Sequence, residues 1–367
     1  MNIYTVRKAT QGLANYILKE GAEKKGVAIA YDSRNMSPEF AEEAALCLAA
    51  NGIKANIFPS LRPTPMLSFT LRELGCTAVV FDNCTEEELS FTLRELGCTA
   101  GIVVTASHNP PEYNGYKVYW EDGAQITAPK DKEIIGEVSA ITDFNEVKTT
   151  TREETEKMGL YEVISSEIDD KYMEALKTQV LHPEIIKEEA SNLKIVYTPL
   201  HGTGNLPVRR VLKELGFEQV YVVKEQELPD GNFPTVSYPN PEDKNAFALA
   251  LKLAEEVDAD IILATDPDAD RLGVYAKAAK TGEYMSFTGN ICDTLSIGAS
   301  VENMLLTATE LGYGTLWIAN TCFAYEELVA YMEITGQLTG AVSLGLPAAT
   351  PNPRPRKSME EVVEYRA

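Results

Sequence analysis

Short apolar runs that alternate with helical segments limit the possible folds of this chain more than any other feature. Each run is followed by a polar loop, and the intervals between runs, such as residues 5–24 and 38–51, have a helical pattern. The runs are residues 26–33, 54–60, 100–107, 193–199, 220–225 and 260–266. Continuous apolar strands separated by helices are typical of mixed or parallel sheets covered on both faces. The sequence therefore predicts an α/β protein with its chemistry in loops at the carboxyl ends of strands.

The length of 367 residues suggests about two or three domains, at roughly 150 residues each. A polar, charge-rich stretch at residues 141–158 is the expected boundary. We place one α/β domain at residues 1–150 and a second at 160–285. The remaining segment, 292–367, differs in character and is discussed below.

The charge balance and the cysteine pattern exclude several functions. The chain has 33 basic and 55 acidic residues, a net charge of −22, so its general field does not favour nucleic acid or an anionic membrane. No apolar run approaches the ~18 residues of a membrane span, and the first residues lack a secretory signal. The six cysteines are scattered without a CxxC pair, as reduced thiols are. We expect a cytoplasmic protein with a small-molecule partner; the oligomeric state stays open.

The segment LSFTLRELGCTA occurs twice, at residues 67–78 and 89–100. Two copies are too few for a solenoid, so the simpler interpretation is a tandem duplication of one helix–strand unit. The second copy runs directly into the apolar strand at 100–104. We therefore expect the second copy to supply that strand and the other copy to be displaced to a sheet edge or to the surface.

A serine follows the strand at 100–104. Ser107 is held at the strand's end by a loop with two prolines, and the turn Asn114-Gly115 returns Lys117 towards it. A serine beside a lysine suits a covalent phosphoryl carrier with the lysine as proton shuttle. From these local residues alone, a turn that caps the next element is the favoured alternative. A Ser-His hydrolase is disfavoured because adjacent side chains in an extended loop point apart, which places His108 poorly as a base, and because no G-x-S-x-G elbow is present.

The strand at 260–265 ends in a run of carboxylates. Asp266, Asp268 and Asp270 alternate, so in extended backbone they fall on one side of the chain. Three carboxylates at one place repel each other unless a cation such as Mg²⁺ neutralises them. An EF-hand is excluded, since its glycine and glutamate positions hold Arg271 and Lys277. A solvated acidic turn is the remaining alternative.

Together the segments TASHNPPEYNGYK (105–117) and DPDADRLG (266–273) resemble the α-D-phosphohexomutase superfamily, the phosphoglucomutases and phosphomannomutases. Four further segments support the resemblance, which covers roughly residues 1–290. They are Tyr31-Asp32-Ser33-Arg34, Pro63-Thr64-Pro65, Thr198-Pro199-Leu200-His201-Gly202-Thr203-Gly204 and Pro239-Asn240-Pro241-Glu242.

The resemblance implies a mechanism and a set of roles. A phosphoserine at Ser107 donates its phosphoryl group to a hexose monophosphate, and the bisphosphorylated sugar turns round and returns the other phosphoryl group. The remaining assignments are Mg²⁺ on the phosphoserine, Asp266, Asp268 and Asp270, proton transfer by Lys117 with His108 beside it, and phosphate or substrate contacts by Arg34, Asn109, His201 and Arg271. For His108 and His201, bracing of their own loops is an equal alternative.

The chain departs from the family pattern at both ends. The family has four domains, with a T-x-G-x-R segment upstream, a G-E-x-S-G sugar-reading loop and a C-terminal R-x-S-G-T loop; none of these motifs is found here. The resemblance therefore does not decide whether the substrate is a glucose or a mannose phosphate, or whether this chain is active.

Residues from about 292 onward resemble the C-terminal part of an FMN-dependent nitroreductase. The Gly-Tyr-Gly-Thr turn at 312–315 and the basic pair Arg356 and Lys357 match positions near the flavin in that family. The N-terminal half of such a site is not visible, so FMN binding is not expected, and a solvated basic tail is the favoured explanation of the pair.

The sequence as a whole predicts a phosphohexomutase that interconverts hexose 1-phosphate and hexose 6-phosphate, with glucose as the expected hexose. A bisphosphorylated hexose would prime the serine, and Mg²⁺ would be the metal. The alternatives are a flavin oxidoreductase carried by the C-terminal segment and an inactive metal-binding remnant.

Overall fold

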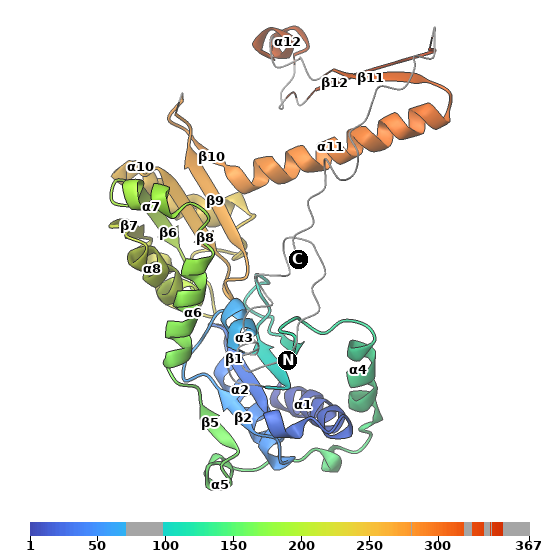
Figure 1. Cartoon of the computed structure of the whole chain (residues 1–367), viewed down its shortest axis with the longest axis vertical. Helices are drawn as coiled ribbons and strands as arrows, with labels where there is room; N and C mark the ends of the chain where they lie inside the picture. Colours follow the sequence, from blue (N-terminus) through green and yellow to red (C-terminus); the bar gives the residue numbers. More distant parts are fainter. Residues whose placement is uncertain (71–97, 280, 319–324, 334–337, 339, 348–367) are drawn as a thin grey trace. The chain divides into compact units, whose positions relative to one another are not determined.

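The computed structural model describes residues 1–70, 98–279, 281–318, 325–333, 338 and 340–347. The chain divides into two compact units, Met1–Met285 and Ser286–Ala367. The first contains both predicted α/β domains, each built around its own five-stranded sheet (Figure 1).

The first sheet has the strand order β4-β3-β1-β2-β5. Its strands are β1 (Val27–Tyr31), β2 (Ala55–Ile57), β3 (Ala100–Val104), β4 (Tyr116–Trp120) and β5 (Tyr161–Val163). All neighbours run parallel except β3 and β4, which are antiparallel. The apolar runs at 26–33, 54–60 and 100–107 are thus confirmed as strands. The antiparallel strand β4, which carries Lys117, was not among the predicted strands.

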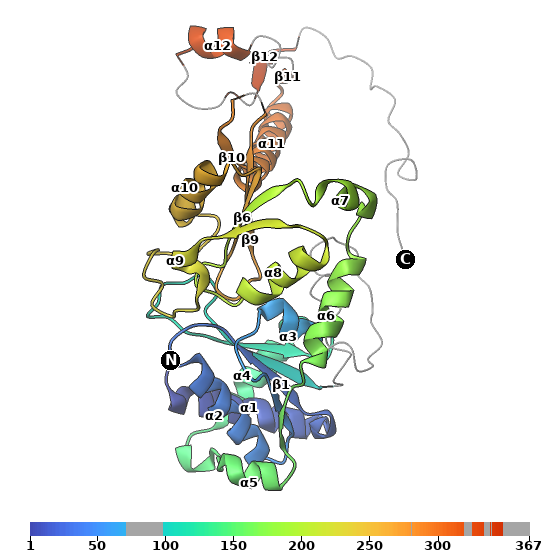
Figure 2. The same ribbon diagram turned by 90° about the vertical axis from the view of Figure 1, so that its left-hand side faces the viewer.

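Helices cover both faces of the first sheet, as the continuous apolar strands predict (Figure 2). Val27 and Ile29 of β1 pack into a core with α1 (Ile3–Lys19) and α2 (Ser37–Ala50). Ala28 and Ala30 face the other way, towards α3 (Thr64–Thr70) and α6 (Glu167–Thr178). Because alternate residues of β1 are buried on opposite faces, the strand lies in the centre of a layered α/β/α domain. Helix α4 (Lys130–Ala140) packs beside α1.

The first sheet extends beyond the predicted domain boundary. After α5 (Arg152–Lys157), strand β5 pairs with β2, with Tyr161 opposite Ala55. This strand lies in the segment that the sequence assigned to the second domain. The charge-rich stretch therefore does not end the first sheet, because the chain crosses it and then returns to the edge of that sheet.

The second sheet has the order β10-β9-β8-β6-β7. Its strands are β6 (Lys194–Thr198), β7 (Gln219–Val222), β8 (Ile261–Thr265), β9 (Leu272–Lys277) and β10 (Tyr284–Ser286). Strands β7, β6 and β8 are parallel, and β9 returns antiparallel beside β8. The second-domain helices are α7 (Pro183–Glu189), α8 (Asn205–Glu214), α9 (Lys224–Glu227) and α10 (Ala248–Val257). Helix α10 packs on β6 and β8 through Ala250 and Ala254. The predicted strands at 193–199 and 260–266 are confirmed, whereas the strand predicted at 220–225 ends at Val222 and α9 begins at Lys224.

The duplicated segment lies mostly outside the described residues. The first copy begins in α3, where Leu67 is fully buried, and the second copy ends at β3, where Cys98 and Ala100 are buried. The second copy therefore delivers the strand that leads to Ser107, as predicted. The expected displacement of the other copy concerns residues 71–97, which the structure does not describe.

The second unit contains α11 (Phe287–Glu310), β11 (Gly314–Ile318), α12 (Tyr325–Tyr331) and β12 (Ala341–Gly345). Strands β11 and β12 form an antiparallel pair, with Thr315 opposite Leu344. These elements neither establish nor contradict the nitroreductase resemblance. Within the described part of the chain, no helix has both the length and the apolar character needed to cross a bilayer.

Candidate functional site

Two loops that lie far apart in the sequence meet within the first unit. The serine loop, residues 105–115, follows β3, and the acidic loop, residues 266–271, follows β8. The Oγ of Ser107 donates a hydrogen bond of 3.0 Å to Oδ2 of Asp266. The carboxyl ends of two strands from different sheets thus bring a hydroxyl to a carboxylate, as the position of the motifs predicts.

Ser107 has a left-handed backbone conformation, with φ of +53°. This conformation costs a non-glycine residue about 1–2 kcal/mol and needs support from its surroundings. It also turns the loop out of the extended form, so that Nδ1 of His108 lies 3.2 Å from Oγ of Ser107. The premise that these two side chains point apart was wrong, because residue patterns do not reveal the sign of a backbone φ.

The three predicted metal ligands lie together. One carboxylate oxygen from each of Asp266, Asp268 and Asp270 falls within 4.8 Å of the others, and the first two side chains are buried. Burial, followed by the charges of Asp268 and Asp270, raises the pKa of Asp266 well above its ordinary value. Burial and the charge of Asp268 likewise raise the pKa of Asp270. This repulsion is what a bound cation would relieve.

The oxygens of Asp268 suit a hard cation. Its Oδ2 accepts hydrogen bonds of 3.0 Å from both Thr64 Oγ1 and Lys117 Nζ. Its Oδ1 is buried and has no hydrogen-bond partner. A buried carboxylate oxygen without a partner is costly, and Mg²⁺ takes oxygen ligands of this type. The residues present therefore fit Mg²⁺.

Lys117 reaches the acidic loop from β4 of the first sheet. Its Nζ lies 3.0 Å from Asp268 Oδ2 and 3.5 Å from Asp270 Oδ2. Burial disfavours the charged form, but the two carboxylates outweigh it, so the pKa of Lys117 is raised. The same ammonium outweighs the effect of burial on Asp268, whose pKa is lowered. Lys117 therefore acts as a counter-ion within the site. The turn at Asn114-Gly115 predicted that the chain would return this lysine towards the serine.

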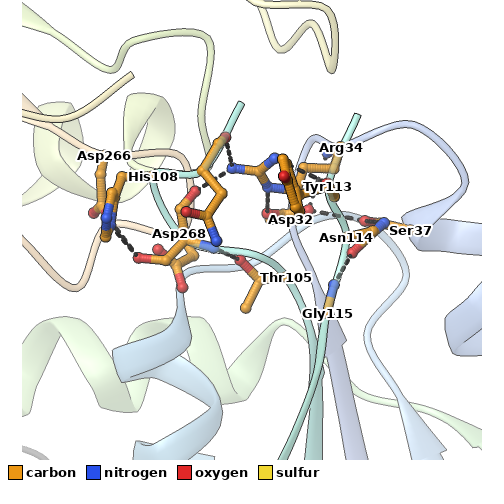
Figure 3. Close-up of polar contacts among 12 residues, drawn as sticks. Asp32, Arg34, Ser37, Thr105, His108, Tyr113, Asn114, Gly115, Asp266 and Asp268 are labelled. Atoms are coloured by element: carbon orange, nitrogen blue, oxygen red, sulfur yellow. Dashed lines mark hydrogen bonds and ion pairs between the residues drawn. The ribbon is translucent and has the colours of Figure 1, made fainter. Parts of the chain in front are cut away.

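Arg34 was expected to meet phosphoryl charge, but the structure places it beneath the serine loop. Its side chain and that of Asp32 are both fully buried, and Nε lies 3.2 Å from Asp32 Oδ2. The terminal nitrogens of the guanidinium donate to backbone carbonyls of the serine loop (Figure 3). The four donors of its terminal nitrogens are consequently occupied within the protein, and Nε, which makes no hydrogen bond, is buried.

Arg271 and His108 lie at the open side of the site. The Nη1 of Arg271 lies 3.3 Å from Glu242 Oε1, and the side chain is 38% exposed, so it is accessible to an anion. The ring of His108 packs edge-on against Tyr238 at 5.3 Å. Burial, together with the charge of Arg271, lowers the pKa of His108. The exposed residue Asn109 contributes its carbonyl to the loop's internal bonding and leaves its side chain at the surface.

His201 is not brought to the site as a binding group. It is buried, its Nδ1 lies 3.1 Å from the carbonyl of Leu228, and its Nε2 lies 2.9 Å from Thr235 Oγ1. Both ring nitrogens are therefore used to brace the loop at 228–235. Of the two interpretations that the sequence left open for His201, these contacts favour bracing.

Two contributors to the site were not predicted. Thr64 belongs to the first domain and contacts the acidic loop of the second. In addition to its side-chain hydrogen bond, its backbone NH donates to the carbonyl of Asp268 at 2.8 Å. Gly202 packs so closely on the acidic loop that a Cβ there would lie 2.5 Å from Pro267 Cα. Both residues stand in segments that supported the resemblance. Their contact partners are too distant in sequence to be inferred from local pattern.

The fold and site define an α/β protein with a serine hydroxyl against a buried acidic cluster and a lysine. Comparison with protein families identifies its class more closely. The phosphoglucomutase/phosphomannomutase α/β/α domain II matches residues 170–280, and α/β/α domain I matches in two overlapping pieces, 1–83 and 71–144. The overlap falls on the duplicated segment. The chain belongs to the phosphoglucomutase/phosphomannomutase family.

Individual relatives agree with this membership. The chain is 38% identical to a protein of Haemophilus influenzae named probable phosphomannomutase, over 79% of this chain and 53% of that one. It is 37% identical to the phosphoglucomutase of Staphylococcus saprophyticus, over 79% of this chain and 47% of the relative. The chain thus spans about half the length of these relatives.

A solved structure supports the fold alone. A phosphoglucomutase/phosphomannomutase family protein from Burkholderia thailandensis matches with a TM-score of 0.56 and 24% identity, covering 77% of this chain and 52% of that chain.

Proposed function

We propose that the chain carries the phosphoryl-transfer half of a phosphohexomutase, which interconverts hexose 1-phosphate and hexose 6-phosphate through a phosphoserine at Ser107. The observation that carries the proposal is the 3.0 Å contact between Ser107 Oγ and Asp266 Oδ2, with Lys117 on the neighbouring Asp268. The packing of the two sheets does not by itself require the hydroxyl of Ser107, from one sheet, to face a buried acidic cluster of the other sheet. Phosphoryl transfer depends on positioning and charge, which this arrangement supplies.

The proposed transfer moves one phosphoryl group between two oxygens. The bond from phosphorus to Ser107 Oγ breaks as a bond from phosphorus to a sugar hydroxyl forms, and the hydroxyl proton ends on Oγ. Asp268 and Asp270 hold Lys117 protonated in the free protein, so it first acts as a donor to phosphoryl oxygens. It carries the hydroxyl proton only once those carboxylates are neutralised. His108, 3.2 Å from Oγ, is placed to share that proton.

Mg²⁺ is the metal we propose for this site, held by Asp266, Asp268, Asp270 and the phosphoserine. When bound, it neutralises carboxylate charge and stabilises the negative oxygens of the transferring group. Arg271 is the exposed cation that we assign to substrate phosphate, since its guanidinium is only weakly engaged with Glu242. Asn109 at the loop surface is the second proposed contact.

Priming by a bisphosphorylated hexose tests the proposal. Purified protein is incubated with Mg²⁺ and glucose 1,6-bisphosphate, and phosphate is located by intact mass and peptide mapping. We expect one phosphate at Ser107 and none in Ser107→Ala, with Ser191→Ala, an exposed serine of the same unit, as the matched control that retains the label. Label at another residue, or no label in the parent protein, would refute the proposal.

A coupled assay then addresses the substrate. Formation of glucose 6-phosphate from glucose 1-phosphate is compared with the mannose reaction, because the relatives carry both names. Glucose is our proposed hexose. Since the chain spans half of its relatives, labelling of Ser107 without turnover would identify an inactive remnant instead of a complete mutase.

A flavin oxidoreductase remains the alternative for residues 292–367, and it rests on the sequence resemblance alone. Neither family match extends beyond residue 280. We expect no FMN to copurify with the protein, because Arg356 and Lys357 alone would provide only an electrostatic contact. Stoichiometric flavin absorbance in the purified protein would favour the alternative.

A further inference from the structure

Four backbone carbonyls of the serine loop converge on the guanidinium of Arg34. Nη1 donates to the carbonyls of Pro110 and Tyr113, each at 3.0 Å. Nη2 donates to the carbonyls of Ser107 at 2.5 Å and Asn109 at 2.6 Å. Carbonyl oxygens carry partial negative charge and repel one another, so this loop shape needs a cation at its centre.

Arg34 is itself fixed in place. Its Nε lies 3.2 Å from Asp32 Oδ2, and both side chains are fully buried. The guanidinium also lies 5.1 Å from the ring centroid of Phe233, which belongs to the second domain. Asp32 is held in turn, because its Oδ1 accepts from the backbone NH of Arg34 and from Ser37 Oγ. The four N–H donors of the two terminal nitrogens lie in one fixed plane and match the four carbonyls of the loop, whereas a lysine ammonium has only three donors on a single nitrogen.

The contact with Ser107 determines where its hydroxyl points. The peptide before Ser107 is held because its NH donates to Thr105 Oγ1 at 2.8 Å. The peptide after Ser107 is held because its carbonyl accepts from Arg34. With both peptides fixed, Ser107 stays in its left-handed conformation, and this conformation aims Oγ at Asp266.

We propose that Arg34 is a positioning residue: it holds the serine loop in the one shape that presents Ser107 Oγ to the acidic cluster, and it does not contact substrate. The proposal deepens the proposed function and rests on it, since presentation of Oγ matters for phosphoryl transfer to this residue. Misplacement of a reacting group by about 1 Å lowers a rate by roughly 100-fold, so loss of the fork has a large predicted effect.

The test uses two variants, because removal of Arg34 alone would leave Asp32 buried and unpaired. Arg34→Lys keeps the charge and loses the fork. The double variant Asp32→Asn with Arg34→Met removes the ion pair as a whole, a change that buried pairs often tolerate. Arg7→Met is the matched control, since it removes an arginine–glutamate pair with Glu43 in the same domain, away from the loop.

Three measurements are made on the full chain: hydrogen exchange of peptides over residues 105–116 and over β6, the melting temperature, and the rate of Ser107 labelling against the concentration of glucose 1,6-bisphosphate. We expect faster exchange confined to 105–116 in both variants. The maximal labelling rate should fall by about 100-fold with the half-saturating concentration nearly unchanged. Arg7→Met should match the parent protein in both respects.

Specific outcomes would overturn the proposal. Parent-like loop exchange and labelling in Arg34→Lys would show that the fork is not needed. Faster exchange spread equally over the whole unit would assign Arg34 to general stability. If the parent protein takes no label at Ser107, the proposed function fails, while loop-confined exchange in the variants would still establish Arg34 as the clamp.

Discussion

The serine loop and the acidic loop are delivered by the same strand geometry and braced by different chemistry. In each sheet a parallel strand, β3 or β8, leads into the loop, and the next strand, β4 or β9, returns antiparallel beside it. In each sheet the brace comes from the loop after the neighbouring parallel strand, β1 or β6. The first brace is the buried guanidinium of Arg34, and the second is close backbone packing by Gly202 and Thr203.

Loop length explains the difference. The serine loop is long, contains two prolines and has few hydrogen bonds between its own backbone groups, so its carbonyls need an external donor. The acidic loop is short, and Thr203 NH donates to the carbonyl of Pro267 at 2.8 Å. A further internal cation beside Lys117 would also compete with the Mg²⁺ that we propose for the acidic loop. Close packing by glycine fixes the second loop without introducing charge.

The largest expected effect concerns the acidic loop. Asp268→Asn removes a charge from a buried carboxylate whose Oδ1 has no protein partner, so Mg²⁺ affinity should fall by at least about 100-fold. Isothermal titration measures the affinity, and circular dichroism checks that the fold is kept. Asp258→Asn, an exposed acid of the same domain, is the matched control and should bind as the parent does. Equal affinity in Asp268→Asn would remove it from the metal site.

The next effect tests packing as the brace of the acidic loop. Gly202→Ala would place a Cβ 2.5 Å from Pro267 Cα and 2.7 Å from Pro267 O, and backbone atoms cannot move aside cheaply. We expect the free energy of unfolding to fall by about 1–3 kcal/mol, measured by denaturant titration. Gly136→Ala in α4 is the control: nothing lies within 4 Å of its Cβ, so it should gain about 0.5–1 kcal/mol. Similar changes in both would contradict a packing brace.

A smaller effect is expected at the contact from the first domain to the acidic loop. Thr64→Val keeps the shape of the buried side chain and removes the 3.0 Å hydrogen bond to Asp268 Oδ2, while the backbone bond remains. The cost should be about 0.5–1.5 kcal/mol in stability, with Mg²⁺ affinity lowered only a few-fold. Thr64→Ser retains the hydroxyl and should restore both quantities. If Thr64→Val lowered Mg²⁺ affinity as much as Asp268→Asn does, the role of Thr64 would not be limited to orienting one oxygen of Asp268.

The two loops also differ in how far the sequence could predict them. The sequence predicted that Asp266, Asp268 and Asp270 lie together because they alternate after an apolar strand, and they do lie together. Their loop is nevertheless a turn with Ala269 at a φ of +54°, and not the extended backbone that the alternation assumed. The long loop likewise contains a left-handed residue, Ser107, and depends in addition on contacts with Arg34, more than 70 residues earlier in the chain. Neither the sign of a dihedral angle nor such a pairing is encoded in local hydrophobic pattern.

The same reasoning explains the remaining differences in the fold. Buried parallel strands such as β1, β3 and β8 were predicted because both of their faces are apolar. The antiparallel strand β4, with its partly exposed Tyr116 and Lys117, and the edge strand β5 lack that pattern. A buried acid–arginine pair directly after an apolar strand, Asp32 with Arg34, was the available signal for an internal clamp, because such a pair must be satisfied within the protein.

The smallest expected effect concerns a polar contact between the domains that lies outside both braces. Asn35 Nδ2 donates to Asn232 Oδ1 at 2.9 Å, and the bond is exposed to solvent. Water replaces such a bond when it is broken, so Asn232→Ala should change the free energy of unfolding by less than about 0.5 kcal/mol. A double-mutant cycle with Asn35→Ala isolates the pairwise coupling, which should be of similar size. A coupling as large as that between Thr64 and Asp268 would contradict this expectation. It would mean that exposed contacts between the domains stabilise the two loops as much as the buried braces do.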